Sequence, residues 1–233
     1  MIATKIKLYD LAGAKDERFS PFCWRVRFAL LHKGLPFETL PWRLTEKETI
    51  TFSGQGKVPV IVDGERVVHD SWVIAEYLED TYADRPSLFG GSSGKALSRF
   101  VTDWVETVLY PVIPRLIATD VYAHLHDEDK EYFRKTREAR FGMTLEEGCA
   151  DREERLVSFR SSLAPLRATL QAQPFLAGQE PAWADYVAFS AFQWARCISS
   201  FPLLATDDSI VSWRDRLLDA FDGEARLAMA YDC

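Results

Sequence analysis

The stretch "VPVIVDGERVVHDS", residues 58–71, decides the fold class of this chain. Two β-branched runs flank Asp63 and Gly64, and an Asp-Gly pair between such runs is the strongest short-range signal for a β-hairpin. The next segment, "SWVIAEYLEDTY", is expected to form a helix, for which Ser71 is a suitable N-cap. The stretch therefore predicts a strand, a turn, a second strand and a helix.

Upstream of the hairpin, the sequence predicts a β-α-β unit. "KIKLYDL" (residues 5–11) alternates in polarity, and "PFETLPW" (residues 36–42) is a second strand candidate. Between them, Ser20 is a suitable N-cap, Pro21 occupies the first helical position and Gly34 is a natural stop for a helix. The order β-α-β followed by β-β-α is that of a thioredoxin-like domain.

The composition changes after this α/β part, residues 1–83. "DRPSLFGGSSGK" (residues 84–95) is rich in Pro, Gly and Ser and is interpreted as an interdomain linker. Long segments of helical period without a further hairpin signal predict an all-helical domain over residues 96–233. Pro111 and Pro114 are expected to end or kink the first of its helices.

The composition is that of a soluble protein, with 47% hydrophobic and 27% charged residues. A net charge of -7 and the lack of a basic stripe disfavour nucleic acid as a partner. The N-terminus lacks the apolar core of a signal peptide, and no apolar run is long enough to span a membrane. We therefore expect a cytoplasmic protein that does not bind membranes.

No metal site or disulfide framework is indicated. The cysteines are widely separated and form no C-x-x-C pair: Cys23, Cys149, Cys197 and Cys233. They are expected to be reduced thiols. His124 and His126 lie two residues apart, so on a helix they would point to different sides and would not bind one metal ion.

Four motifs, in order along most of the chain, resemble the glutathione transferases. They are "SPFCWRVRFAL", similar to the helix start of the serine-type classes, "KVPVIVDG", "HDSWVIAEYL" and the capping segment "FLAGQEPAWADYVAF". A narrower resemblance, to the bacterial β-etherases, is carried by "SPFCWR", "KVPVIVDG", "DSWVIAEYL" followed by "DRPSLF", "REERL" and "ADYVAFSAFQWA". The general resemblance implies a detoxifying enzyme that uses glutathione as a co-substrate. The narrower one implies cleavage of β-aryl ethers, and generic conjugation of aryl halides and peroxide reduction are the alternatives.

The resemblance gives Ser20 a chemical role beside its role as a helix cap. A free thiol has a pKa of about 8.5, and the thiolate is the nucleophile. A reduction of that pKa by about two units requires roughly 2.7 kcal/mol of preferential stabilisation of the thiolate. The Ser20 hydroxyl and the positive end of the helix dipole could both contribute to this stabilisation. A helix N-cap and a thiolate-stabilising residue would therefore occupy the same position.

The resemblance also implies where glutathione binds. A cis Val58-Pro59 bond would let the backbone of Val58 pair with the cysteinyl part of glutathione. Asp70 and Ser71 would hold its γ-glutamyl part, and Lys57 would meet its glycyl carboxylate. Each residue also has a structural alternative. Pro59 could be an ordinary proline in an edge strand, Ser71 could be only a helix cap, and Lys57 could be a solvated surface lysine.

The sequence departs from the patterns of related proteins at two places, the start of the first helix and the capping segment. The redox relatives of the fold have Cys where this chain has Ser20, and Cys23 stands at the position of their resolving thiol, so disulfide exchange is not expected. In the capping segment Asp185 is present, but Ala182 stands where Ser, Thr or Asn would complete the capping box. That loss should cost about 1 kcal/mol of stability.

Aromatic residues could line a pocket for an aryl electrophile or belong to the core: Phe22, Trp24, Trp104, Tyr110 and Trp194. Two functions remain open, a glutathione transferase and a non-catalytic relative that binds hydrophobic ligands or partners. A binding module has no use for a thiolate stabiliser, so Ser20 together with the glutathione-binding residues favours the enzyme. The resemblance further implies a homodimer.

Overall fold

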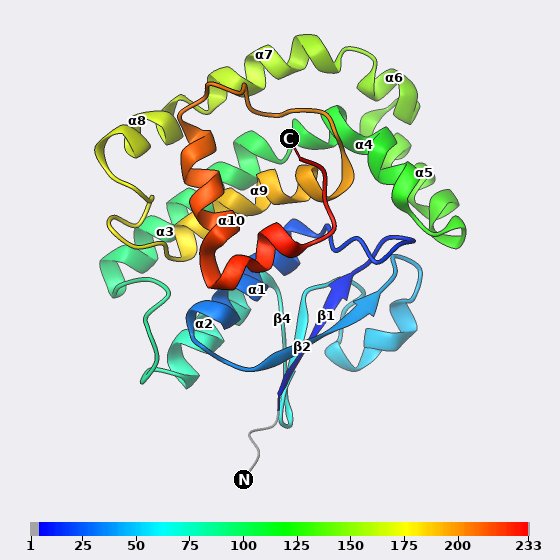
Figure 1. The fold of residues 1–233 in the computed structure, drawn as a ribbon. Helices are drawn as coiled ribbons and strands as arrows, with labels where there is room; N and C mark the ends of the chain where they lie inside the picture. Colours follow the sequence, from blue (N-terminus) through cyan, green and yellow to red (C-terminus); the bar gives the residue numbers. More distant parts are fainter. Residues whose placement is uncertain (1–4, 233) are drawn as a thin grey trace.

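A four-stranded mixed sheet forms the first half of the molecule, and a cluster of helices forms the second (Figure 1). The computed structural model describes residues 5–232. The elements of the first half are β1 (Ile6–Leu11), α1 (Pro21–His32), β2 (Phe37–Trp42), the 3-10 helix η1 (Lys47–Ser53), β3 (Val60–Asp63), β4 (Arg66–His69) and α2 (Ser71–Thr81). The elements of the second half are α3 (Ser92–Trp104), the π-helical turn η2 (Val105–Leu109), α4 (Ile113–His124), α5 (Asp127–Phe141), α6 (Leu145–Cys149), α7 (Arg152–Ser162), α8 (Ala164–Ala172), α9 (Trp183–Ile198) and α10 (Ile210–Leu227).

The sheet has the strand order β2-β1-β3-β4. Strand β1 is parallel to β2 and antiparallel to β3, and β3 and β4 form the predicted hairpin. The turn lies one residue later than the Asp-Gly pair suggests, because Asp63 pairs with Arg66 and leaves Gly64 and Glu65 as the turn. Gly64 has a φ of +57°, a conformation that glycine adopts without strain.

The second half is helical, and its first long segment is interrupted where the prolines predict. Helix α3 is followed by a π-helical turn and then by a bend before α4. Pro111 lies in that bend and Pro114 is in the first turn of α4, where a missing N–H costs no hydrogen bond. The α/β half and the all-helical half confirm the predicted fold class.

Helix α1 contacts both halves of the molecule. It packs on the sheet and also against α9, whose side chains are almost all buried. Phe28 stacks on Tyr186 with ring centroids 5.2 Å apart, and His32 Nδ1 lies 2.7 Å from the Tyr186 hydroxyl. These contacts fix the C-terminal part of α1 relative to the helical half.

A buried carboxylate organises the start of α9. Asp185 accepts hydrogen bonds from three backbone N–H groups, those of Leu176, Ala177 and Ala182, and from the Trp213 indole at 2.9 Å. Burial raises the pKa of Asp185, and the four donors oppose that rise because they favour the charged form. As expected, Ala182 offers no side-chain cap in return.

The connection between the halves is held by an ion pair. Lys33, which is 1% exposed, lies 2.7 Å from Glu79 on α2, and Glu79 also accepts from Leu88 N–H at 2.9 Å and from the Ser87 hydroxyl. The expected division into domains at residues 84–95 stays a prediction, and residues 1–4 and 233 lie outside the described part.

Within residues 5–232, no helix is long and apolar enough to cross a membrane. The cysteines Cys23, Cys149 and Cys197 are free and buried, whereas the expected free thiol of Cys233 lies outside the described residues. No cluster of three or more metal-binding side chains occurs in the same described range.

Candidate active site

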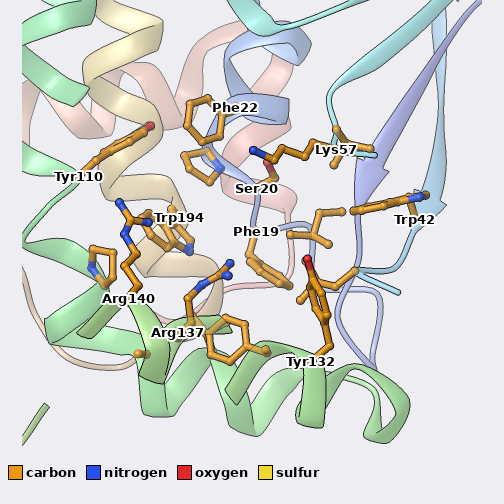
Figure 2. Close-up of a pocket in the computed structure, with 18 of the residues that line it drawn as sticks. Phe19, Ser20, Phe22, Trp42, Lys57, Tyr110, Tyr132, Arg137, Arg140 and Trp194 are labelled. Carbon is orange, nitrogen blue, oxygen red and sulfur yellow. The ribbon is translucent and has the colours of Figure 1, made fainter. Parts of the chain in front are cut away.

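A cavity of about 450 Å³ lies between the α/β half and the helical half (Figure 2). Its walls come from the start of α1, the loop before β3, and helices α4, α5 and α9. Residues predicted from the sequence that line it are Ser20, Phe22, Lys57, Val58, Tyr110 and Trp194. The fold therefore brings the start of α1 and most of the expected aromatic residues to one cavity.

Ser20 is the N-cap of α1 and lines the cavity, although only 4% of it is exposed. Its Oγ accepts a hydrogen bond from Cys23 N–H at 3.3 Å. Because Ser20 Oγ is the acceptor in this contact, its own proton can be donated to another group. Pro21 at the first helical position has no N–H, so it cannot donate to the group that accepts the Ser20 hydroxyl proton.

Cys23 is a buried thiol next to the Ser20 and Asp10 side chains, and it does not line the cavity. It is 0% exposed, and its Sγ lies 3.8 Å from the Tyr9 carbonyl oxygen. Burial and the negative charge of Asp10 raise the pKa of Cys23 well above its ordinary value. A thiol held in its neutral form is a poor nucleophile, so we do not expect Cys23 to act as one.

The loop before β3 forms one edge of the cavity. The Val58-Pro59 peptide bond is cis, as the resemblance implies, and the half-buried Val58 lines the cavity. Lys57 is exposed and also lines it, while its backbone N–H donates to Gln55 Oε1 at 3.1 Å. The Lys57 ammonium is thus placed at the rim, where an anionic group could reach it.

Asp70 and Ser71 stand at the start of α2, outside the cavity lining. Asp70 Oδ1 accepts from the N–H groups of Trp72 at 2.9 Å and Val73 at 3.1 Å, so the helix cap is Asp70 and not the expected Ser71, which is the first residue of α2. Asp70 has a φ of +70°, a conformation that is costly for a non-glycine residue and that often occurs at ligand sites. Their contacts with glutathione stay predictions.

An aromatic wall of the cavity begins beside Ser20, at Phe22 (Figure 2). The rings of Phe22 and Tyr110 meet edge to face at 5.4 Å, and those of Tyr110 and Trp194 do so at 6.0 Å. The guanidinium of the buried Arg25 lies over Phe22 and Tyr110 and pairs with Glu106 at 2.7 Å. These contacts make the wall rigid and well suited to an aryl group.

Tyr110 contributes a ring to this wall and has no proton to offer. Ser190 Oγ donates to the Val187 carbonyl at 2.7 Å, so in its 3.0 Å contact with Tyr110 the tyrosine must be the donor. Burial raises the pKa of Tyr110, and the positive charge of Arg25 opposes that rise. Tyr110 therefore stays a neutral phenol whose proton is already in use.

Trp24 and Trp104 were also candidates for this wall and lie elsewhere. Trp24 is 1% exposed, and its indole donates to the Arg18 carbonyl. Trp104 is half-buried against the core at the end of α3, and neither residue is among those that line the cavity.

The sequence did not single out several residues that line the cavity: Phe19, Trp42, Tyr132, Arg137 and Arg140. The aromatic residues among them follow no motif. The two arginines lie three residues apart, a spacing that predicts one helix face but does not say which way that face points.

Comparisons with known proteins identify the family. The family model "Glutathione S-transferase, C-terminal domain" matches residues 96–216, which is more than half of the chain, and "Glutathione S-transferase, N-terminal domain" matches residues 19–81. The chain belongs to the glutathione S-transferase family.

Individual relatives agree with this assignment. A zeta-class glutathione S-transferase of Euphorbia esula is 35% identical over 114 residues, which cover 46% of this chain and 48% of that protein. Glutathione S-transferase U2 of Arabidopsis thaliana is 36% identical over 96 residues, covering 40% of this chain and 43% of that protein. The matches span about half the length of these curated relatives.

Solved structures resemble the whole described fold. Glutathione transferase GSTFuA3 from Phanerochaete chrysosporium has a TM-score of 0.77 at 26% identity, covering 97% of this chain and 95% of its own. The glutathione S-transferase CsGST63524 of Ceriporiopsis subvermispora, solved in complex with glutathione, has a TM-score of 0.82 at 22% identity, covering 96% and 98%.

Proposed function

We propose that this chain is a serine-type glutathione transferase that attacks hydrophobic, aromatic electrophiles with the glutathione thiolate. The observation that carries the proposal is the position of Ser20, which caps α1 with its acceptor side and opens into a cavity with an aromatic wall. The thiolate would accept the Ser20 hydroxyl proton as a hydrogen bond near the positive end of α1. Both contacts favour the charged form of the thiol.

Glutathione would lie along the α/β half. Its cysteinyl backbone would pair with Val58, its glycyl carboxylate would meet Lys57, and its γ-glutamyl part would reach Asp70 and Ser71 at the start of α2. The cis bond before β3 and the rim position of Lys57 support this placement. The sulfur would then stand beside Ser20, which lines the same cavity as Lys57 and Val58.

The particular reaction we propose is cleavage of a β-aryl ether next to a ketone. The thiolate sulfur forms a bond to the carbon beside the carbonyl, and the carbon–oxygen bond breaks so that a phenolate leaves with the electron pair. The phenolate later takes a proton from water. The adjacent carbonyl activates the carbon and the leaving group is stable, so no acid catalyst is needed; the rigid aromatic wall would orient the aryl group.

The test is turnover of a phenoxyacetophenone and of a chlorodinitrobenzene with glutathione. We expect both to be consumed, with release of phenol from the first, and no reaction when S-methylglutathione replaces glutathione. Turnover of the chloro compound without phenol release would limit the function to generic conjugation. Binding of glutathione without turnover of any electrophile would instead favour the alternative, a non-catalytic ligand-binding protein.

We also propose a homodimer and a cytoplasmic location, both of which rest on the resemblance. Exposed apolar side chains on each half support the dimer. Phe52 on η1 is 50% exposed, and Leu97 and Phe100 on α3 are 68% and 72% exposed. A second copy of the chain would remove such groups from water.

A further inference from the structure

The cavity has a charge opposite to that of the molecule. The chain carries a net charge of -7, yet its cavity is lined by the cations Lys57, Arg137 and Arg140 and by one acid, Glu106. Glu106 is already paired with Arg25 at 2.7 Å. The cavity therefore presents an excess of positive charge to anything that enters it.

Arg137 and Arg140 have no carboxylate partner among residues 5–232. Arg137 donates only to the neighbouring Thr136 hydroxyl at 3.0 Å, and its guanidinium lies 4.7 Å from the centre of the Phe133 ring. Arg134, one turn earlier on the same helix, is paired at 2.9 Å with both Glu138 and Glu146. The helix thus pairs Arg134, which is outside the cavity lining, whereas the half-buried Arg137 and the exposed Arg140 line the cavity without an acid.

The two unpaired guanidinium groups are close enough to affect each other. Burial and the positive charge of Arg140 lower the pKa of Arg137. Two like charges beside an apolar cavity are unfavourable in the empty protein, and an anion placed between them would relieve that repulsion. Figure 2 shows both side chains reaching into the cavity from α5, the helical side, whereas Ser20 and Lys57 lie on the α/β side.

We propose that Arg137 and Arg140 bind a carboxylate on the electrophile, so that the preferred second substrate is an aromatic acid. This inference rests on the proposed function, since it assigns the α/β side of the cavity to glutathione. Lys57 is available for the glycyl carboxylate there, which leaves the arginines for the second substrate. A planar carboxylate fits the guanidinium fork, and the aryl group would lie between the arginines and Ser20 against Tyr110 and Trp194.

The test compares two chlorodinitro compounds that differ in one group. One is a benzoate with a chlorine substituent para to the carboxylate. The other is the matching benzamide, which has nearly the same shape without the charge. In both, the glutathione sulfur bonds to the carbon that carries chlorine, and chloride leaves with the electron pair. We expect the wild type to prefer the benzoate in kcat/KM, mainly through a lower KM.

The variants Arg137→Gln and Arg140→Gln should each lower the benzoate-to-benzamide ratio of kcat/KM by about 10-fold or more, the loss expected for a charge-assisted hydrogen bond. Lys135→Gln is the matched control, because it removes one positive charge from an exposed position on the same helix outside the cavity. Its ratio should stay within about twofold of the wild type. An equal fall in all three variants would overturn the proposal.

Further outcomes separate this inference from the proposed function. A rise in the KM for glutathione, with an unchanged benzoate-to-benzamide ratio, would assign the arginines to glutathione and overturn the inference alone. If neither compound is turned over, the proposed function fails, and the inference is then tested by calorimetric binding of dinitrobenzoate without glutathione. Binding that both arginine variants weaken by about 10-fold would support the carboxylate site, and equal binding to all variants would refute it.

Discussion

Ser20 caps α1, and this observed role can be separated by substitution from the thiolate contact that we propose for its hydroxyl. Ser20→Ala removes both, so we expect a fall in turnover of roughly 10 to 100-fold together with about 1 kcal/mol of lost stability. Ser20→Asp keeps a side-chain acceptor for Cys23 N–H but has no proton to donate and would repel a thiolate. It should recover only part of the stability that Ser20→Ala loses, because the position is only 4% exposed and a buried charge is costly, and it should still lose turnover, as measured by urea unfolding and by initial rates. Full activity in Ser20→Asp would remove the hydroxyl from the mechanism.

At this scale the sequence identified residues whose local pattern carries the signal. Ser20 stands before a proline at the start of a helix, and the Val58-Pro59 pair stands next to a hairpin. Arg137 and Arg140 could not be identified in this way, because a charged helix face looks the same whether it meets water or a cavity. Only the packing of α5 beside the start of α1 distinguishes the two cases.

The start of α9 offers a prediction for a single element. Ala182→Ser should stabilise the protein by about 0.5–1 kcal/mol, because a serine oxygen at the N-cap can accept the N–H of Asp185 while Asp185 already accepts that of Ala182. Denaturant unfolding measures the gain. Ala184→Ser is the control, since it adds the same hydroxyl inside the helix, where the residue is buried and has no cap to complete. A gain in the control equal to that of Ala182→Ser would contradict the capping explanation.

The ion pair between α1 and α2 predicts a dependence of stability on pH. Burial acts to raise the pKa of Glu79, but hydrogen bonds from Lys33, Ser87 and Leu88 outweigh it and lower that pKa. A depressed folded-state pKa stabilises the protein above the ordinary glutamate value and loses this effect as pH falls through the folded-state pKa. Glu79→Gln should therefore lose about 2 kcal/mol or more at neutral pH, because it leaves the buried Lys33 without its counter-charge.

The measurement for Glu79→Gln is the free energy of unfolding from pH 7 down to pH 3. The difference between wild type and variant should shrink as the pH falls below about 4.5, since the wild-type carboxylate then becomes protonated. A difference that stays constant across this range would show that Glu79 acts through packing and not through its charge.

Helices and strands were predicted best where a regular spacing of apolar residues is bounded by Gly, Pro or cap residues. The strands β1 and β2, helix α1 and the hairpin lie where their patterns indicate, and Pro111 explains the break after α3. The turn of the hairpin shifted by one residue because strand pairing, not the Asp-Gly pair alone, fixes its register. The short helix α6 escaped prediction because five residues are too few to show a period.

For the whole molecule we expect a dimer in solution. Phe100→Glu should convert it to a 26.6 kDa monomer at micromolar concentration, because a charge would replace an apolar side chain that is 72% exposed in the single chain. Sedimentation velocity gives the mass. Val157→Glu is the control, since Val157 on α7 is 68% exposed and lies outside the proposed contact. A wild type that sediments as a monomer would refute the dimer.

The shared position of α1 limits how the two halves can be exchanged between relatives. The helix carries Ser20 at its start, packs on the sheet and stacks Phe28 on Tyr186 of α9. A chimera that joins this α/β half to the helical half of a relative would therefore bring together two helix surfaces with unmatched side chains, on the helix that carries Ser20. We expect such hybrids to regain activity only when α9 is transplanted with α1, so the practical unit for recombination is this helix pair and not either half.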